Sequence, residues 1–299
     1  MPSDLDLRGV WIPLITPFTA SDEVDVAAVE RLSNEYLDAG ARGIVALGTT
    51  GESPALDAAE KAVVIATTSR VCAQRGAPLI VGTGTNSTRT TVSATGALTG
   101  TPALVAALVV TPYYVRPSVE GIVAHFRAVA AASPVPLVLY NIPSRTGRAI
   151  PPDAMIELSR DPNIAGVKQA LSALDADTLE ILTGADPGFQ VLGGEDTILY
   201  PMTLMGAVGA ICASAHVCTE RFVAMIECGL AGKVDDGRVH AETLLPVVRA
   251  GFAEPNPSVF KGVLHAQGRI ATPDLRLPMT NASPGAVQRA LAAIEAAAA

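Results

Sequence analysis

The chain has 299 residues, of which 49% are hydrophobic, and a formal net charge of −8 at pH 7. This composition is sufficient for a substantial core and excludes an intrinsically disordered chain. The negative charge argues against a general binder of nucleic acids or of anionic membranes. The first residues, MPSDLDLRGVW, contain acids and no apolar signal core, and the longest uncharged run (90–115) is interrupted by Gly, Thr and Pro. We therefore expect a cytoplasmic protein without a membrane span.

Eight short apolar runs recur along the chain, and each is followed by Gly, Thr or Pro and then by a helical pattern. The runs are VWIPLIT (10–16), GIVALG (43–48), PLIVGTG (78–84), AALVVTP (106–112), PLVLYN (136–141), IAGVKQ (164–169), FQVLGG (189–194) and GAICAS (209–214). Nearly continuous apolar segments are typical of strands buried on both faces of a parallel sheet. The helices expected between them include 26–39, 57–73, 118–132 and 152–160. This alternation predicts a (β/α)8 TIM barrel.

Beyond about residue 231 the strand signals end. The pattern there predicts three helices, at 233–250, 257–268 and 283–298. We therefore expect a barrel carrying the active site over 1–231 and a C-terminal helical appendage over 232–299. A doubly wound sheet is the second interpretation. It is disfavoured because no GxGxxG follows the first strand and because eight strands close naturally into a barrel.

Four polar residues recur at the ends of successive predicted strands. From Thr83 to Thr111, Tyr140 and Lys168 the steps are 28, 29 and 28 residues, which is about one βα unit each. Residues at the same phase in successive units lie on the same rim of a barrel. Because these residues end their strands, that rim is the one where barrel enzymes carry their chemistry.

Lys168 stands out among the chain's lysines, which are Lys61, Lys168, Lys233 and Lys261. Only Lys168 directly follows a predicted strand. A buried ammonium must be paired, lose its proton or do chemistry. One interpretation is therefore an amine that attacks a carbonyl group. The other is a strand-end lysine whose head group extends into solvent.

Three loops at the predicted rim contain further candidates. GTTGES (48–53) offers the hydroxyls of Thr49 and Thr50 in a glycine-rich turn, which suits a carboxylate or phosphate but also an ordinary strand–helix turn. In LYNIPSRTG (139–147), Tyr140 could move protons and Arg145 could pair with a carboxylate, unless they are simply a core tyrosine and a surface arginine. TPYYVRPS (111–118) places Tyr114 in an active site or a subunit interface.

The cysteines and histidines, which could bind a metal, are scattered along the chain. The cysteines show no CxxC pair and the four histidines show no i, i+4 pair, so a metal site is not expected and the thiols are interpreted as small buried side chains. An amine, several hydroxyls and an arginine without paired acids suit Schiff-base chemistry on a keto acid better than hydrolysis.

Six motifs in order along the chain carry a family resemblance. They are GTTGES, TPYYVRPS, YNIPSRTG, GVKQA, EPNP (254–257) and LRLPMT (275–280). Together they cover essentially the whole chain. In these motifs the sequence resembles the dihydrodipicolinate synthase / N-acetylneuraminate lyase family.

The resemblance implies a role for each candidate. Lys168 would attack C2 of pyruvate and form a Schiff base that is deprotonated to an enamine. Tyr140 would move protons through the Thr49 hydroxyl to Tyr114, which in the family reaches in from the neighbouring subunit. Four residues would bind substrate: Thr50 the pyruvate carboxylate, Arg145 the carboxylate of L-aspartate 4-semialdehyde, and Gly194 and Ile211 as backbone lining of the pocket.

The resemblance further implies a lyase that condenses pyruvate with L-aspartate 4-semialdehyde to 4-hydroxy-tetrahydrodipicolinate, in lysine and diaminopimelate biosynthesis. No cofactor is expected, because the lysine itself is the electron sink. The family's usual form is a homotetramer, a dimer of dimers. Ala58, Lys61 and Thr90 stand where lysine-inhibited members carry histidines and a glutamate, so we expect L-lysine to inhibit weakly or not at all.

Two features keep a second substrate assignment open. Gln169 follows the lysine where the synthases usually have Glu or Asp, and GAICASAHV (209–217) differs from their eighth strand. The alternative is a pyruvate-dependent class I aldolase acting on another aldehyde, of the keto-deoxy sugar acid, 4-hydroxy-2-oxoglutarate or N-acetylneuraminate type. Arg145 argues against it, because a neutral polyol chain has little use for an arginine. A non-catalytic binding protein is disfavoured because it would need no proton shuttle.

Overall fold

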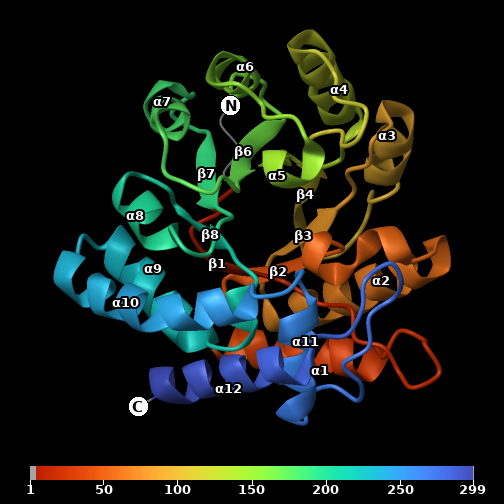
Figure 1. Ribbon diagram of the computed structural model, residues 1–299. Helices are drawn as coiled ribbons and strands as arrows, with labels where there is room; N and C mark the ends of the chain where they lie inside the picture. The colour runs from red at the N-terminus through yellow and green to blue at the C-terminus, as the bar shows by residue number, and fades with distance from the viewer. Residues whose placement is uncertain (1–4, 299) are drawn as a thin grey trace.

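The computed structural model describes residues 5–298 and contains a closed parallel barrel (Figure 1). The strands are β1 (Gly9–Pro13), β2 (Gly43–Ala46), β3 (Leu79–Gly82), β4 (Leu104–Val110), β5 (Leu137–Asn141), β6 (Ile164–Gln169), β7 (Gln190–Gly193) and β8 (Gly209–Ile211). Each strand pairs in parallel with the next, and β1 pairs with β8 to close the barrel. The predicted (β/α)8 barrel is confirmed, and the doubly wound sheet is wrong.

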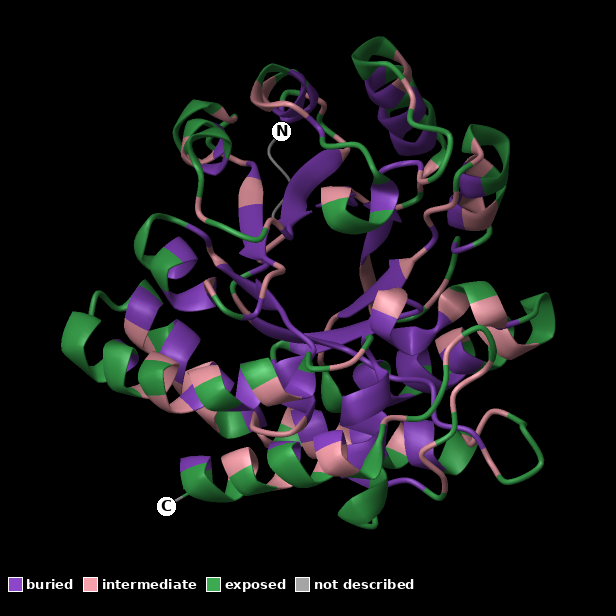
Figure 2. Cartoon of the chain, in the orientation of Figure 1, coloured by how far each residue is buried: buried purple, intermediate pink, exposed green. Residues whose placement is uncertain are grey.

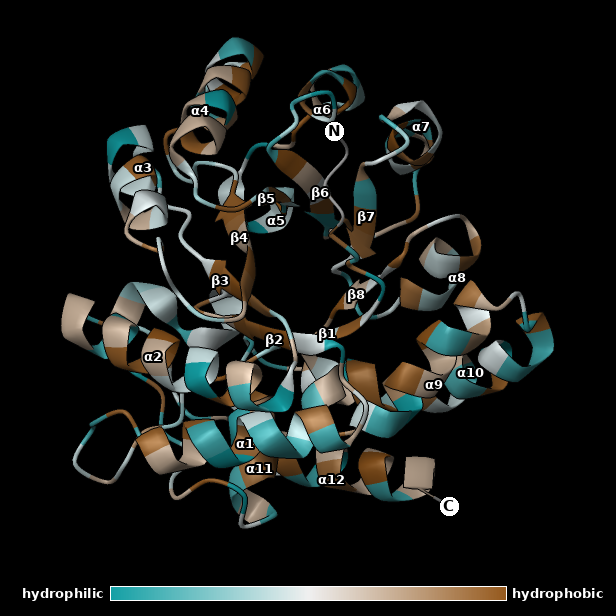
Figure 3. Cartoon of the chain, turned by 180° about the vertical axis from the view of Figure 1, so that it is seen from behind, coloured by the Kyte–Doolittle hydropathy of each residue, from teal (hydrophilic) through white to brown (hydrophobic). Residues whose placement is uncertain are grey.

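Helices surround the strands because each crossover between parallel strands must return along the outside of the barrel. The α-helices of the barrel are α1 (Val26–Asp38), α2 (Ala58–Arg75), α3 (Thr88–Gly96), α4 (Val119–Ala132), α5 (Pro143–Thr146), α6 (Pro152–Leu158), α7 (Ala176–Gly184), α8 (Leu199–Leu204) and α9 (Thr219–Leu230). Short 3₁₀ turns are η1 (Thr49–Gly51), η2 (Ser53–Ala55) and η3 (Ser214–His216). Figure 2 shows the strands almost wholly buried, and Figure 3 shows them apolar, with polar residues on the outer helix faces.

Three further helices follow the barrel: α10 (Val234–Gly251), α11 (Ser258–Ala266) and α12 (Pro284–Ala298). They match the predicted helices to within two residues. They pack on one side of the barrel, with α10 along α9 and α11 in front of α1 (Figure 1). The division of the chain near residue 231 into two regions stays a prediction. Within residues 5–298, none of the helices combines the length and the apolar character needed to cross a membrane.

A buried ion pair joins this C-terminal region to the loop after β2. Lys261 Nζ lies 2.7 Å from Glu52 Oε1, and the two side chains are 0% and 3% exposed. Lys261 also donates to the carbonyl of Asp274 at 2.6 Å, and its Nζ lies 4.1 Å from the centroid of the Phe18 ring. Burial lowers the pKa of Lys261, whereas the neighbouring Glu52 opposes that shift. Lys261 is thus a second buried lysine, and it is fully paired.

Breaking this ion pair at one partner is expected to be strongly destabilising. Removing one partner of a buried pair leaves an uncompensated charge, which costs about 3–5 kcal/mol. We therefore expect Lys261→Met and Glu52→Gln each to lower the free energy of unfolding by about that amount, measured by urea denaturation. The double variant should lose less than the sum of the two, because neither charge is then left alone.

Lys61→Met is the matched control. Lys61 on α2 is only partly buried, and no ion pair of Lys61 is found within residues 5–298. Its replacement should change the unfolding free energy by no more than about 0.5 kcal/mol. Equal losses in Lys61→Met and Lys261→Met, or strictly additive losses in the double variant, would contradict the assigned role of the pair.

Candidate active site

Lys168 and Tyr140 lie side by side at the rim of the barrel. They are register partners on the neighbouring strands β6 and β5. Lys168 is only 7% exposed, and its Nζ lies 4.5 Å from the centroid of the Tyr140 ring. In the described part of the chain, no carboxylate forms an ion pair with this lysine. The lysine therefore does not extend into solvent, and unlike Lys261 it is buried without a paired acid.

Gly194 makes room for the Lys168 side chain at the end of β7. A Cβ at residue 194 would lie 2.8 Å from Lys168 Cε and 2.9 Å from its Cγ. Such distances are too short for real carbon atoms, so any side chain here would displace the lysine. Ile211, at the end of β8, is 1% exposed and belongs to the same inner cluster as Tyr140.

The loop after β2 holds its hydroxyl groups in a tight backbone arrangement. Thr49–Gly51 form η1, and two nearby residues adopt the left-handed conformation: Leu47 (φ 57°), two positions before η1, and Glu52 (φ 52°), directly after it. Non-glycine residues in that region cost of order 1–3 kcal/mol each and persist only where the surroundings enforce them. Leu47 can adopt its conformation because residue 82 is glycine: a Cβ at Gly82 would lie 2.3 Å from the Leu47 carbonyl oxygen. Glu52 is held in its conformation by the ion pair with Lys261.

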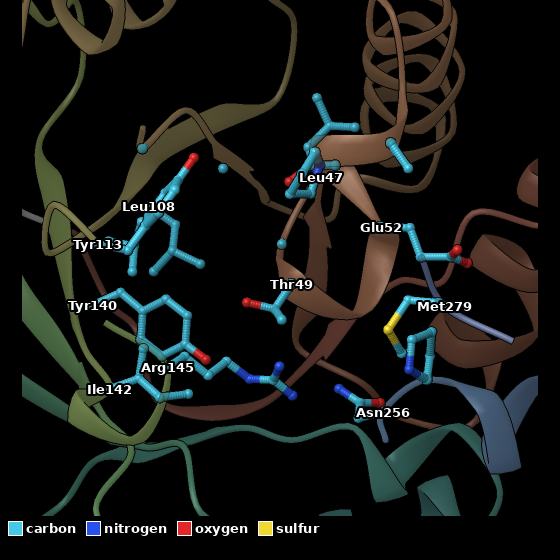
Figure 4. Close-up of a pocket in the computed structure, with 18 of the residues that line it drawn as sticks. Leu47, Thr49, Glu52, Leu108, Tyr113, Tyr140, Ile142, Arg145, Asn256 and Met279 are labelled. Atoms are coloured by element: carbon cyan, nitrogen blue, oxygen red, sulfur yellow. The ribbon is translucent and has the colours of Figure 1, made fainter. Parts of the chain in front are cut away.

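A cavity of about 380 Å³ opens at this rim (Figure 4). Of the residues predicted for the site, Thr49, Tyr140 and Arg145 line it. The Arg145 guanidinium extends across the cavity toward Asn256 (Figure 4), and within residues 5–298 it forms no ion pair. Five predicted residues are not among those that line it: Lys168, Thr50, Tyr114, Gly194 and Ile211. The Lys168 amine lies beside the ring of Tyr140, which does line the cavity.

Several lining residues were not predicted, and six of them come from beyond residue 231. These six are Asn256, Pro257 and residues 276–279, and Glu52 in the loop after β2 was likewise not predicted. The motifs EPNP and LRLPMT marked these stretches, but strand periodicity assigns no chemistry to residues outside the barrel. The cavity is therefore built from both sides of residue 231.

Tyr114 does not line the cavity of its own chain. Its side chain is 87% exposed, its φ is 71°, and the neighbouring Val115 is 56% exposed. Tyr113, by contrast, does line the cavity. A role for Tyr114 thus requires a second chain, as the family resemblance implies.

A buried carboxyl group lies near Lys168. Asp196 is 6% exposed and accepts a hydrogen bond from the backbone N–H of Ser214 at 2.7 Å. Burial raises the pKa of Asp196 to about 6, while the bonds from Ser214 and the charge of Lys168 act in the opposite direction. The sequence carried no signal for this residue beyond its place after the seventh strand.

Gln169 and His216, which belong to the two segments that depart from the synthase pattern, are packing residues. Gln169 Oε1 accepts from Asn141 Nδ2 at 3.0 Å, and Gln169 Nε2 donates to the Thr178 hydroxyl of α7 at 3.2 Å. Because successive strand residues face opposite sides, Gln169 points to the helix layer while Lys168 points inward. His216 is fully buried and its Nε2 accepts from the Ile15 N–H at 3.2 Å. Neither residue lines the cavity.

Comparisons with known proteins agree with this arrangement. A model of the dihydrodipicolinate synthetase family matches residues 6–297. A Moorella thermoacetica protein named 4-hydroxy-tetrahydrodipicolinate synthase is 38% identical over 284 residues, covering 94% of this chain and 95% of that protein. A dihydrodipicolinate synthase of Acinetobacter baumannii, chloride-inhibited and complexed with pyruvate, is 31% identical, with a TM-score of 0.93 over 98% of this chain and 99% of that chain. A dihydrodipicolinate synthase variant described as monomeric is 29% identical, with a TM-score of 0.93 over 97% of both chains.

The match includes the C-terminal helices as well as the barrel, so it covers every segment that contributes to the cavity. The sequence comparisons and the structural comparisons therefore indicate the same family. The chain belongs to the dihydrodipicolinate synthetase family.

Proposed function

We propose that the protein is a 4-hydroxy-tetrahydrodipicolinate synthase that condenses pyruvate with L-aspartate 4-semialdehyde. The Lys168 amine attacks C2 of pyruvate, and loss of water gives an iminium. Removal of a C3 proton then yields an enamine, whose C3 attacks the aldehyde carbon of the second substrate. The amine of that substrate attacks C2 and releases the lysine as the ring closes. The lysine nitrogen thus serves as the electron sink throughout.

The observation that carries this proposal is Lys168, a buried amine without a paired acid at the active rim of the barrel. Its Nζ lies 4.5 Å from the Tyr140 ring centroid, where the ring face favours a cation such as the iminium. Tyr140 lines the cavity and lies beside the lysine, so its hydroxyl is well placed to move protons for the reacting atoms. Thr49 supplies a second hydroxyl from the cavity wall.

Arg145 supports the choice of the second substrate. Its guanidinium lies in the cavity without an acidic partner among the described residues, and it offers a bidentate site for a carboxylate. L-Aspartate 4-semialdehyde carries such a carboxylate. The unusual Gln169, which left other aldehydes open, faces α7 and does not line the cavity.

Pyruvate should label Lys168 covalently. Reduction with borohydride in the presence of pyruvate is expected to add a stable pyruvyl group at Lys168, located by peptide mass spectrometry. Lys168→Met should abolish both labelling and turnover, whereas Lys61→Met should retain both. Labelling at another lysine, or none in the wild type, would overturn the Schiff-base assignment.

Arg145→Ala should selectively weaken the use of the semialdehyde. A hydrogen bond to a charged group contributes about 1.5–3 kcal/mol, so kcat/KM for that substrate should fall about 10- to 100-fold. The Michaelis constant for pyruvate should hardly change, as measured in a coupled assay with both substrates varied. Arg148→Ala is the control, because the exposed Arg148 does not line the cavity. An unchanged rate in Arg145→Ala would refute the carboxylate role.

We also propose a cytoplasmic homotetramer, a dimer of dimers, in which Tyr114 completes the site of a neighbouring chain. Tyr114 and Val115 form an exposed apolar tip on the loop after β4. A bulky residue held in left-handed backbone and exposed to solvent is what a subunit contact would bury. A dihydrodipicolinate synthase variant with the same fold is described as monomeric.

Mixed oligomers test this role of Tyr114. Lys168→Met and Tyr114→Phe chains should each be nearly inactive alone. Co-expressed with different tags and isolated as mixed assemblies, they should regain activity, because the intact lysine of one chain meets the intact tyrosine of the other. No recovery in purified mixed assemblies would mean that Tyr114 does not act across the subunit boundary.

A further inference from the structure

Asn256 connects the C-terminal region directly to the loop after β2. It lies just before α11, is only 9% exposed and lines the cavity opposite Arg145 (Figure 4). Its Nδ2 donates a hydrogen bond to the Thr50 hydroxyl oxygen at 3.0 Å, across 206 residues of sequence. Nothing in the mechanism above uses this residue.

The direction of this hydrogen bond restricts what the Thr50 hydroxyl can do. A threonine hydroxyl has one proton to donate and two lone pairs that accept. Because Asn256 occupies a lone pair, the proton remains available for another acceptor. Among the described residues, no other hydrogen bond of this hydroxyl is found. Thr50 is therefore prepared to donate, which is what an anionic ligand requires.

The surroundings reinforce the same connection. Two residues after Thr50, Glu52 is bound to Lys261 of α11 at 2.7 Å and accepts from the backbone N–H of Arg276 at 3.1 Å. The loop is thus held at two points by the C-terminal region. The ion pair with Lys261 fixes where the loop lies, and the bond from Asn256 sets the polarity of one hydroxyl group within it.

We propose that Asn256 is a positioning residue that keeps the Thr50 hydroxyl oriented as a hydrogen-bond donor to the pyruvate carboxylate. This inference rests on the proposed function, because it assigns the ligand of Thr50 from it. Asn256 acts through Thr50 and touches no reacting atom. Its removal should therefore affect pyruvate capture more than the later steps.

Asn256→Asp is the sharpest test, because it preserves shape while replacing the donor with a carboxylate. The new carboxylate would accept a hydrogen bond from the Thr50 hydroxyl, and it would repel the anionic substrate. Loss of a hydrogen bond to a charged group weakens binding about 10- to 100-fold. The pyruvate concentration that gives half-maximal borohydride labelling of Lys168 should therefore rise about 10- to 100-fold. The Michaelis constant for the semialdehyde should change by less than about twofold.

Thr50→Val provides the coupling test. In that background the hydroxyl is absent, so adding Asn256→Ala should raise the half-maximal pyruvate concentration by less than about twofold, although Asn256→Ala alone raises it severalfold. If Asn256→Asp fails to fold, comparing Asn256→Ala in the wild type with Asn256→Ala in Thr50→Val still tests whether Asn256 acts through Thr50. Equal effects of Asn256→Ala with and without the Thr50 hydroxyl would overturn the proposal.

Asn163→Asp is the control for a purely structural loss. Asn163 stands just before β6, away from the cavity, and donates to the carbonyls of Ala130 and Ser133 at 2.7 and 3.3 Å. Its replacement should lower the melting temperature without changing the pyruvate dependence. The absence of any labelling in the wild type would refute the proposed function itself. Normal wild-type labelling with an unaltered pyruvate dependence in Asn256→Asp would refute only the role of Asn256.

Discussion

The ion pair between Lys261 and Glu52 is the interaction on which the site depends. Both side chains are almost completely removed from water, so neither charge can be buried without the other. Glu52 also stands in left-handed backbone directly after η1, where a bulky residue persists only if its surroundings hold it. The pair therefore fixes the loop that carries Thr49 and Thr50, and it requires the C-terminal region to be folded against the barrel.

The chain buries two lysines in different surroundings. Lys261 has a carboxylate, a carbonyl and an aromatic ring around its ammonium group, which satisfy its charge. Lys168 lies beside the Tyr140 ring and packs against Gly194, which has no side chain. Within residues 5–298, no acid forms an ion pair with it. One environment pairs the ammonium group with an acid, and the other does not. The difference lies in the neighbours, since both side chains are buried.

The alternation of a strand explains why the departure at Gln169 does not reach the cavity. Gln169 follows Lys168 directly, but successive residues on β6 face opposite sides of the barrel wall. Gln169 consequently bonds to Thr178 in the helix layer, and His216 bonds to the backbone of Ile15. Both residues belong to the packing between strands and helices, and neither lines the cavity.

The barrel could be predicted from the chain alone, because continuous apolar runs at regular spacing are a local signal of buried parallel strands. The pairing of Tyr140 with Lys168 could be predicted too, because a 28-residue step equals one βα unit. That Asn256, Glu52 and Lys261 shape the site became evident from the folded structure. Their contacts span 206 and 209 residues, and such long-range contacts leave no periodic trace in the chain.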